Sequence, residues 1–256
     1  MKLIRNIAVA FSLYSQIPMP VFKWNEDDMK HNLVFLPWIG GVIGGIYLGL
    51  LKLFRMVELP LIAKLMILAF IPLFVTGGFH VDGFMDVMDA LKSYKSREEK
   101  LSIMKDPNIG AFAVISLLKY CLIWGSSMAV ILATGEDKLV KVVAVSFFVA
   151  RAVTGITSLT LKHAKKDGML NMETEKLNGI DLAFLTIQFF GGSVLMVMID
   201  TVAGAFAFVG ITAFTFYYRH LTYKEFGGVT GDTAGYYLVM AECVGLMMTA
   251  ISVFIR

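Results

Sequence analysis

Long apolar segments recur along the whole chain and constrain its fold more than any other feature of the sequence. A helix needs about 20 apolar residues to cross the roughly 30 Å hydrocarbon layer of a bilayer. With 57% hydrophobic and 17% charged residues, the composition is also that of a membrane protein rather than a soluble one. The shortest segments are marginal in length, which gives a range of six to eight spans around a best count of seven: 33–51, 59–76, 109–133, 142–161, 182–199, 201–218 and 233–255.

The fold expected from these segments is all-α, a polytopic integral membrane protein. No connection between the spans is long enough to bury a core of its own, so residues 1–256 are expected to form a single integral membrane domain. The first 20 residues combine a basic start with a short apolar stretch, and no small-x-small cleavage site precedes Pro18. This pattern favours an uncleaved helix in the membrane interface. The net charge of +3 and the lack of a basic cluster with interleaved aromatics argue against nucleic-acid binding.

The charges in the connections predict how the chain is oriented in the membrane. Fifteen Lys and Arg residues lie in one set of alternating connections, and five lie in the other set. Basic connections tend to stay in the cytoplasm, so we expect a multi-pass protein of the plasma (inner) membrane with the richer set inside the cell. That set comprises residues 1–32, 77–108, 162–179 and 219–232.

Three aspartates follow the second apolar segment, in the stretch TGGFHVDGFMDVMDALKSY. On a helix, steps of four and seven residues bring Asp82, Asp86 and Asp89 within roughly a 60° sector. Oxygen ligands on one helical face suit a hard cation such as Mg²⁺ or Mn²⁺, and such an ion also bridges the oxygens of a diphosphate. The alternative is a solvated amphipathic helix, but its acids and bases would be mixed, and here the bases begin only at Lys92. The sequence therefore predicts a metal site for a diphosphate substrate.

Further ionisable residues stand at the ends or in the interior of spans, where a membrane makes them costly. Arg151 interrupts the fourth span, and Glu242 lies ten residues beyond Asp232 in the last one. Arg151 and Glu242 could each contact substrate, or they could form a buried structural ion pair. His80, close to the aspartates, could bind substrate or serve only as a cap. The candidates for substrate binding are His80, Lys105, Arg151, Lys166, Asp232 and Glu242, and Asp106 joins the three aspartates as a catalytic candidate.

Three motifs carry a resemblance to a known family: TGGFHVDGFMDVMDA, IMKDPNIGAFA and GGVTGDTAGYYLVMAE. Together they closely resemble the cobalamin synthase family, membrane enzymes also called adenosylcobinamide-GDP ribazoletransferases. The likeness covers most of the chain and includes ARAVTGIT around Arg151 and AKKDGMLN after the fourth span. One position departs from the family pattern, which has a Glu seven residues after Asp232, where this chain has Val239. The later acid of that pattern is present as Glu242.

The resemblance implies the final assembly step of the cobalamin nucleotide loop. Family members join adenosylcobinamide-GDP to α-ribazole or its 5′-phosphate, need Mg²⁺, and release GMP together with adenosylcobalamin or its 5′-phosphate. The three aspartates would then hold one or two Mg²⁺ ions, while Lys105 and Arg151 would neutralise charge on the departing GMP. Asp89 or Asp106 would accept the proton of the attacking ribose hydroxyl. A homo-oligomer or other corrinoid-pathway enzymes would be the protein partners.

Two other functions fit parts of the sequence. A CDP-alcohol phosphotransferase that makes lipids would share the metal chemistry and differ in the acceptor. Those enzymes, however, have an alanine and an arginine after the Asp-Gly of their motif, which this chain lacks. A cation-coupled transporter would use the acids as an ion pathway, and it predicts acids near the middle of several spans rather than at one membrane surface.

Overall fold

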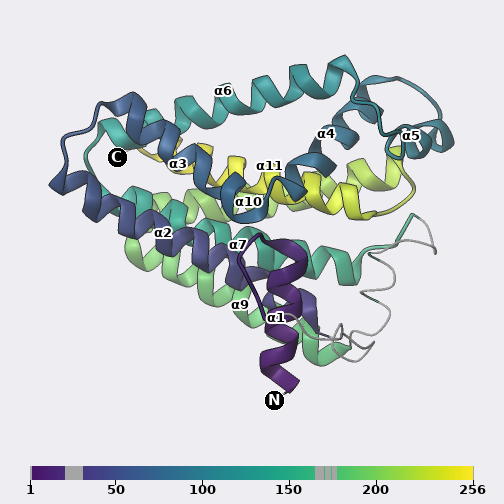
Figure 1. Ribbon diagram of the computed structural model, residues 1–256, viewed down its shortest axis with the longest axis horizontal. Coiled ribbons are helices and arrows are strands. Elements are labelled where there is room, and N and C mark those ends of the chain that lie inside the picture. The colour runs from purple at the N-terminus through teal and green to yellow at the C-terminus, as the bar shows by residue number, and fades with distance from the viewer. Residues whose placement is uncertain (1, 21–30, 165–169, 171–173, 175–177, 256) are drawn as a thin grey trace.

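The computed structural model describes residues 2–20, 31–164, 170, 174 and 178–255 (Figure 1). Within these residues every regular element is a helix, and the one β-bridge joins His163 to Val229. The prediction of an all-α fold is therefore confirmed. In chain order the helices are α1 Lys2–Tyr14, η1 Asn32–Phe35, α2 Leu36–Met56, α3 Leu61–Thr76, α4 Phe79–Lys92, α5 Arg97–Ile103, α6 Ala111–Ala133, α7 Asp137–Thr160, α9 Gly179–Ile199, α10 Thr201–Glu225 and α11 Gly231–Ser252.

Six stretches of helix in the described part of the chain are long and apolar enough to cross a membrane. They are η1 with α2, and then α6, α7, α9, α10 and α11. The pair α3 and α4 makes a seventh if the two helices are counted as one bent span. The predicted range of six to eight spans is confirmed, and the seventh span differs in form from the prediction.

The second predicted span, 59–76, is the one that the structure changes. Helix α3 has only 16 residues, about 24 Å of helix at 1.5 Å per residue. Gly77 and Gly78 follow with φ angles of 65° and 79°, a left-handed conformation that glycine adopts without steric cost. The chain turns there by 95° into α4. The aspartates are thus not in a surface connection, because α4 packs within the bundle against α6 and α11 (Figure 1).

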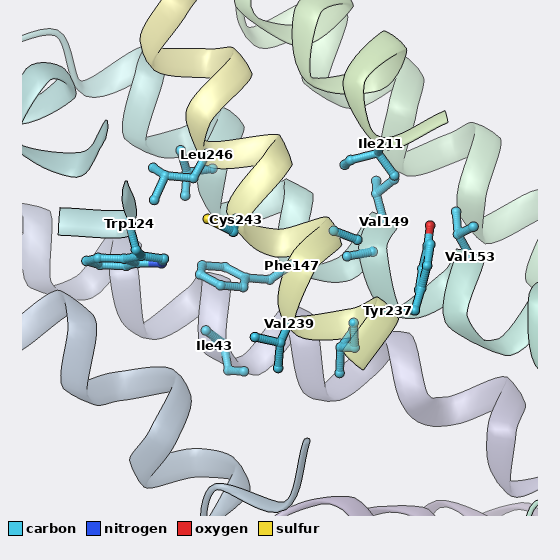
Figure 2. Packing of buried hydrophobic residues seen from close by; sticks show 14 of the residues in the cluster. Ile43, Trp124, Phe147, Val149, Val153, Ile211, Tyr237, Val239, Cys243 and Leu246 are labelled. Carbon is cyan, nitrogen blue, oxygen red and sulfur yellow. The ribbon is translucent and has the colours of Figure 1, made fainter. Parts of the chain in front are cut away.

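Helices α7 and α11 form the centre of the bundle. Their apolar windows are 78% and 72% buried, whereas only 22% of the α9 window is buried. Val239, Cys243 and Leu246 project from α11 into the apolar core (Figure 2). Polar side chains on these two helices therefore need hydrogen-bond or charge partners inside the protein, whereas the outer helices present apolar faces suited to lipid.

The connections gather at two opposite ends of the bundle. At one end, which we call the α5 end, Arg97 donates to the backbone carbonyls of Tyr223 and Lys224, 3.3 and 3.2 Å away, and Lys100 pairs with Glu225. The bridge between residues 163 and 229 lies at this end too. At the other end, ion pairs join Arg55 to Asp137 and Lys138 to Asp200. In the described part of the chain, the connections joined at the α5 end therefore belong to the more basic set, and those joined at the other end belong to the less basic set.

The orientation of the bundle in the membrane can be tested by cysteine labelling. We expect Lys95→Cys, at the α5 end, to resist a membrane-impermeant maleimide in intact cells and to react once the cells are opened. Asp137→Cys, at the opposite end, should react in intact cells, because the more basic connections stay inside. The unmodified chain, with Cys121 and Cys243, gives the background. Labelling of residue 95 in intact cells would reverse the assigned orientation.

Candidate functional site

The aspartate stripe, which we define as Asp82, Asp86 and Asp89 of α4, is positioned by the close packing of α4 against the first turn of α11. A Cβ atom built on Gly83 would lie 2.9 Å from the carbonyl oxygen of Asp232 and 3.0 Å from its Cα atom. A Cβ atom on Gly235 would similarly lie 3.1 Å from the carbonyl oxygen of His80. Two glycines on facing helices therefore let the backbones touch, as small residues do in membrane bundles. This contact brings the predicted residue Asp232 to the stripe on α4.

Four carboxylates near this contact are close enough for their charges to interact. Asp82 is exposed, Asp86 and Asp89 are half-buried, and Asp232 is half-buried in the first turn of α11. The negative charges of Asp82, Asp232 and Asp89 all act on Asp86. Like charges this close repel one another unless a cation lies among them. The structure therefore brings the three predicted aspartates together with a fourth, contributed by a helix 150 residues further along the chain.

Asp89 lies at the start of another helix. A Cβ atom on Gly110, the N-cap of α6, would collide with both carboxylate oxygens of Asp89. Only glycine leaves room for the carboxylate there. The N-terminus of α6 is the positive end of the helix dipole, which attracts a carboxylate. The start of α6 at Gly110 thus packs directly against the Asp89 carboxylate.

Lys105 and Asp106 lie at the α5 end, in the exposed connection between α5 and α6. The Asp106 carboxylate accepts hydrogen bonds from the backbone N–H of Asn108 at 2.9 Å and from its side-chain amide at 2.7 Å. These bonds lower the pKa of Asp106 below its usual value, since they stabilise the charged form. The remaining candidate in a connection, Lys166, lies outside the described residues.

Arg151 and Glu242 form a buried ion pair between α7 and α11. Their side chains are 1% and 7% exposed, and Arg151 also donates to the backbone carbonyl of Phe147 at 3.0 Å. Of the two alternatives raised by the sequence, the structure thus shows the ion pair. A direct role of either residue toward substrate stays a prediction.

A cavity of about 210 Å³ adjoins this ion pair and lies between α3, α4, α6 and α11. Arg151, Glu242 and the predicted residue His80 line its polar side. His80 is buried, and its ring stacks on Tyr14 of α1 with 6.4 Å between centroids. Val239, at the position where the family pattern has an acid, lines the same cavity. Seven predicted site residues therefore fall into two groups: the acidic cluster of Asp82, Asp86, Asp89 and Asp232 on α4 and α11, and His80, Arg151 and Glu242, which line the cavity. Lys105 and Asp106 belong to neither group, since they lie in the exposed connection.

The acidic cluster suits a Mg²⁺ ion that is bound partly by the protein and partly by water and substrate. Among the described residues, no three His, Cys, Asp or Glu side chains lie close enough together to hold a metal ion by themselves. Mg²⁺ is commonly bound through one or two carboxylates, with water and substrate phosphates completing its octahedral shell. Partly exposed carboxylates that repel one another fit that kind of site better than a closed protein cage.

Sequence reasoning missed the residues that position the cluster and line the cavity. Gly83 and Gly235 set the contact between α4 and α11, while Tyr120 and Trp124 of α6 line the cavity. The glycines carried a readable signal, since each occurs beside an acidic motif, in VDGF and GDTAG. The aromatic residues carried none, because aromatic side chains are common throughout the spans.

The contact at Gly83 gives a direct test of this geometry. We expect Gly83→Ala to destabilise the protein by about 1–3 kcal/mol, because the new methyl group meets backbone rather than a movable side chain. Activity should fall as well, since Asp232 moves away from the stripe. Gly45→Ala is the matched control, because a Cβ atom there meets nothing within 4 Å. Equal melting temperatures for the two variants in detergent would show that the helices are not in such close contact.

The chain has clear relatives among known proteins. The model of the family described as cobalamin-5-phosphate synthase matches residues 6–250. A protein of Lachnoclostridium phytofermentans named adenosylcobinamide-GDP ribazoletransferase is 35% identical, over 98% of this chain and 95% of its own length. Proteins of the same name are 30% identical in Clostridium perfringens, over 96% of this chain and 98% of their own, and 29% identical in Listeria monocytogenes, over 90% and 91%. No solved structure matches the chain. The chain therefore belongs to the cobalamin-5-phosphate synthase family, whose members are transferases.

Proposed function

We propose that this protein carries out the Mg²⁺-dependent joining of adenosylcobinamide-GDP to α-ribazole or α-ribazole 5′-phosphate at the cytoplasmic face of the membrane. The products would be GMP and adenosylcobalamin or its 5′-phosphate. The observation that carries this proposal is the convergence of Asp82, Asp86, Asp89 and Asp232 at one contact between α4 and α11. The names of the relatives supply both substrates, the activated corrinoid and the ribazole.

The chemistry is a displacement at phosphorus. A ribose hydroxyl of α-ribazole attacks the phosphate attached to the cobinamide, a new P–O bond forms, and the P–O bond to GMP breaks. A Mg²⁺ ion held by the stripe would neutralise charge on the diphosphate oxygens. One or two of Asp82, Asp86 and Asp232 would hold that ion against the diphosphate, and Lys105 of the exposed connection would neutralise charge on the departing phosphate.

Asp89 is the better candidate for the general base. Its carboxylate lies against the start of α6, half-buried and next to the rest of the cluster. The rival candidate, Asp106, is exposed, and its hydrogen bonds to Asn108 lower its pKa and make it a weaker base. In this proposal Asp89 accepts the proton of the attacking hydroxyl, and Asp106 shapes the connection that carries Lys105.

GMP release from purified protein tests the proposed function. Adenosylcobinamide-GDP should yield GMP only when both α-ribazole and Mg²⁺ are present. A CDP-activated lipid donor should yield no CMP with the same acceptor, which separates this reaction from that of a lipid-making phosphotransferase. GMP release that does not depend on α-ribazole, or that fails with every donor, would contradict the proposal. No observation favours a transporter, since the acids of the cluster lie at one contact and Glu242 is paired with Arg151.

A further inference from the structure

The cavity between α3, α4, α6 and α11 has apolar walls and one polar side. Leu65, Leu73 and Trp124 are among the apolar lining residues. We call the three lining residues His80, Arg151 and Glu242 the floor; Thr76 and Tyr120 also line the cavity. A volume of about 210 Å³ is smaller than the roughly 300–1,000 Å³ of pockets for drug-sized ligands. The cavity is therefore suited to a small, largely apolar group with few polar atoms.

Two buried nitrogen atoms of the floor lack a hydrogen-bond partner among the described residues. They are Nδ1 of His80 and Nε of Arg151. His80 is 7% exposed and Arg151 is 1% exposed, so water reaches neither side chain freely. An unsatisfied buried polar atom is rare in native proteins because it costs free energy. Both residues line the cavity, which points to a ligand that supplies the missing partner.

The charge of the floor restricts the chemistry of that ligand. Arg151 is already neutralised by its ion pair with Glu242. A charged ligand would therefore add an uncompensated charge to an apolar cavity, which is strongly unfavourable. The Nε–H group of Arg151 can only donate, so the ligand needs a hydrogen-bond acceptor. A neutral ring system with one accepting nitrogen meets these requirements.

The cavity adjoins the acidic cluster through α4. His80 and Val81 line the cavity, and Asp82 is the next residue along the helix. From His80 to Asp86 the helix rises by about 9 Å. A nucleoside can span that distance with its base in the cavity and its sugar near the carboxylates.

We propose that this cavity binds the substituted benzimidazole base of α-ribazole, with the free ring nitrogen accepting a hydrogen bond from the floor. This inference rests on the proposed function, and it assigns the subsite of the acceptor. Guanine, the other two-ring base in the reaction, carries donors and acceptors around its edge that the apolar walls would leave unpaired. The corrinoid ring is far too large for the cavity. The methyl-substituted benzo ring, in contrast, has no polar atom and packs against the walls.

Filling the cavity tests this assignment. Gly125 of α6 lines the cavity. In Gly125→Leu the first atom of the new side chain fits without a clash, since a Cβ atom there lies 3.8 Å from Cδ2 of Leu65, an ordinary contact. The matched control is Gly45→Leu on the exposed side of α2, where a Cβ atom meets nothing within 4 Å. We expect Gly125→Leu to raise the KM for α-ribazole by about tenfold or more and to leave the KM for adenosylcobinamide-GDP within about twofold. An unsubstituted benzimidazole riboside, which needs less room, should lose less.

A direct measurement of α-ribazole binding tests the cavity assignment without requiring turnover. Equilibrium dialysis with radiolabelled α-ribazole, without donor, should show binding to the unmodified protein and to Gly45→Leu, and binding weakened by about tenfold in Gly125→Leu. If Gly125→Leu does not elute as a folded protein, His80→Phe replaces it. That variant keeps an aromatic ring against Tyr14, removes the ring nitrogens, and should weaken binding to a similar degree.

The outcomes separate this inference from the function on which it rests. An unmodified protein that releases no GMP from both substrates would refute the proposed function. An active protein whose Gly125→Leu and Gly45→Leu variants bind α-ribazole equally would refute the cavity assignment alone. A selective rise in the KM for the donor would also overturn it and would assign the cavity to guanine instead.

Discussion

Replacing Asp86 by asparagine is expected to reduce the rate of GMP release by a factor of about 10² to 10³, the usual loss for one preorganised electrostatic group. Asparagine keeps the shape of the side chain and removes the charge. Asp86 should be affected most among the aspartates of α4, because the charges of Asp82, Asp89 and Asp232 all act on it. The protein should insert and purify normally, since relief of like-charge repulsion does not destabilise the fold. Initial rates at saturating substrates measure the effect.

Glu98→Gln provides the control for this change. Glu98 is exposed on α5, the next helix after α4, and its replacement also removes one negative charge. We expect its activity to stay within about twofold of the unmodified protein, as for most surface substitutions. Similar losses in Glu98→Gln and Asp86→Asn would mean that the general surface charge matters and the stripe does not.

The second large effect concerns the buried ion pair. Arg151→Met or Glu242→Met alone should destabilise the protein by about 3–5 kcal/mol, because each leaves an uncompensated charge inside the bundle. The double replacement should cost clearly less than either single one, since no charge is then buried. Thermal unfolding of the three variants in one detergent measures the coupling. If both residues also help the cavity to bind α-ribazole, the double variant should regain stability while its KM for α-ribazole stays raised.

An exposed pair gives the reference for that experiment. Lys95 and Glu99 lie one turn apart at 3.3 Å, and both side chains are about half exposed. Their coupling should be below about 1 kcal/mol, as is usual for surface pairs. A coupling of Arg151 with Glu242 no larger than this would contradict a buried pair. Full recovery of activity, including the KM for α-ribazole, in the double variant would exclude a role of either residue toward substrate.

The helical fold and the arrangement of its ends could be predicted from the sequence because hydropathy and charge are local properties. Segment length gave the spans, and the distribution of Lys and Arg separated the two ends that the ion pairs now define. The form of the second span could not be predicted, since a pair of glycines in apolar surroundings is compatible with a straight helix. Only the left-handed conformation of Gly77 and Gly78 shows the turn into α4.

The candidate site was predictable as a set of residues and not as an arrangement. Helical spacing placed Asp82, Asp86 and Asp89 on one face, which is a property of a single helix. The approach of Asp232 depends on packing between helices far apart in the chain, as does the pairing of Arg151 with Glu242, 91 residues away. The cavity follows from the same packing, and a sequence does not reveal such empty space.

The most direct test of the central claim, that the aspartate stripe holds Mg²⁺ against the diphosphate, is a Mg²⁺ titration of GMP release by Asp86→Asn. We predict that half-maximal activity requires about tenfold more Mg²⁺ than in the unmodified protein, and that high Mg²⁺ restores part of the rate. The KM for α-ribazole should stay unchanged, since its base binds elsewhere. If Asp86→Asn keeps activity within about tenfold of the unmodified protein at limiting Mg²⁺, the stripe is not the metal site.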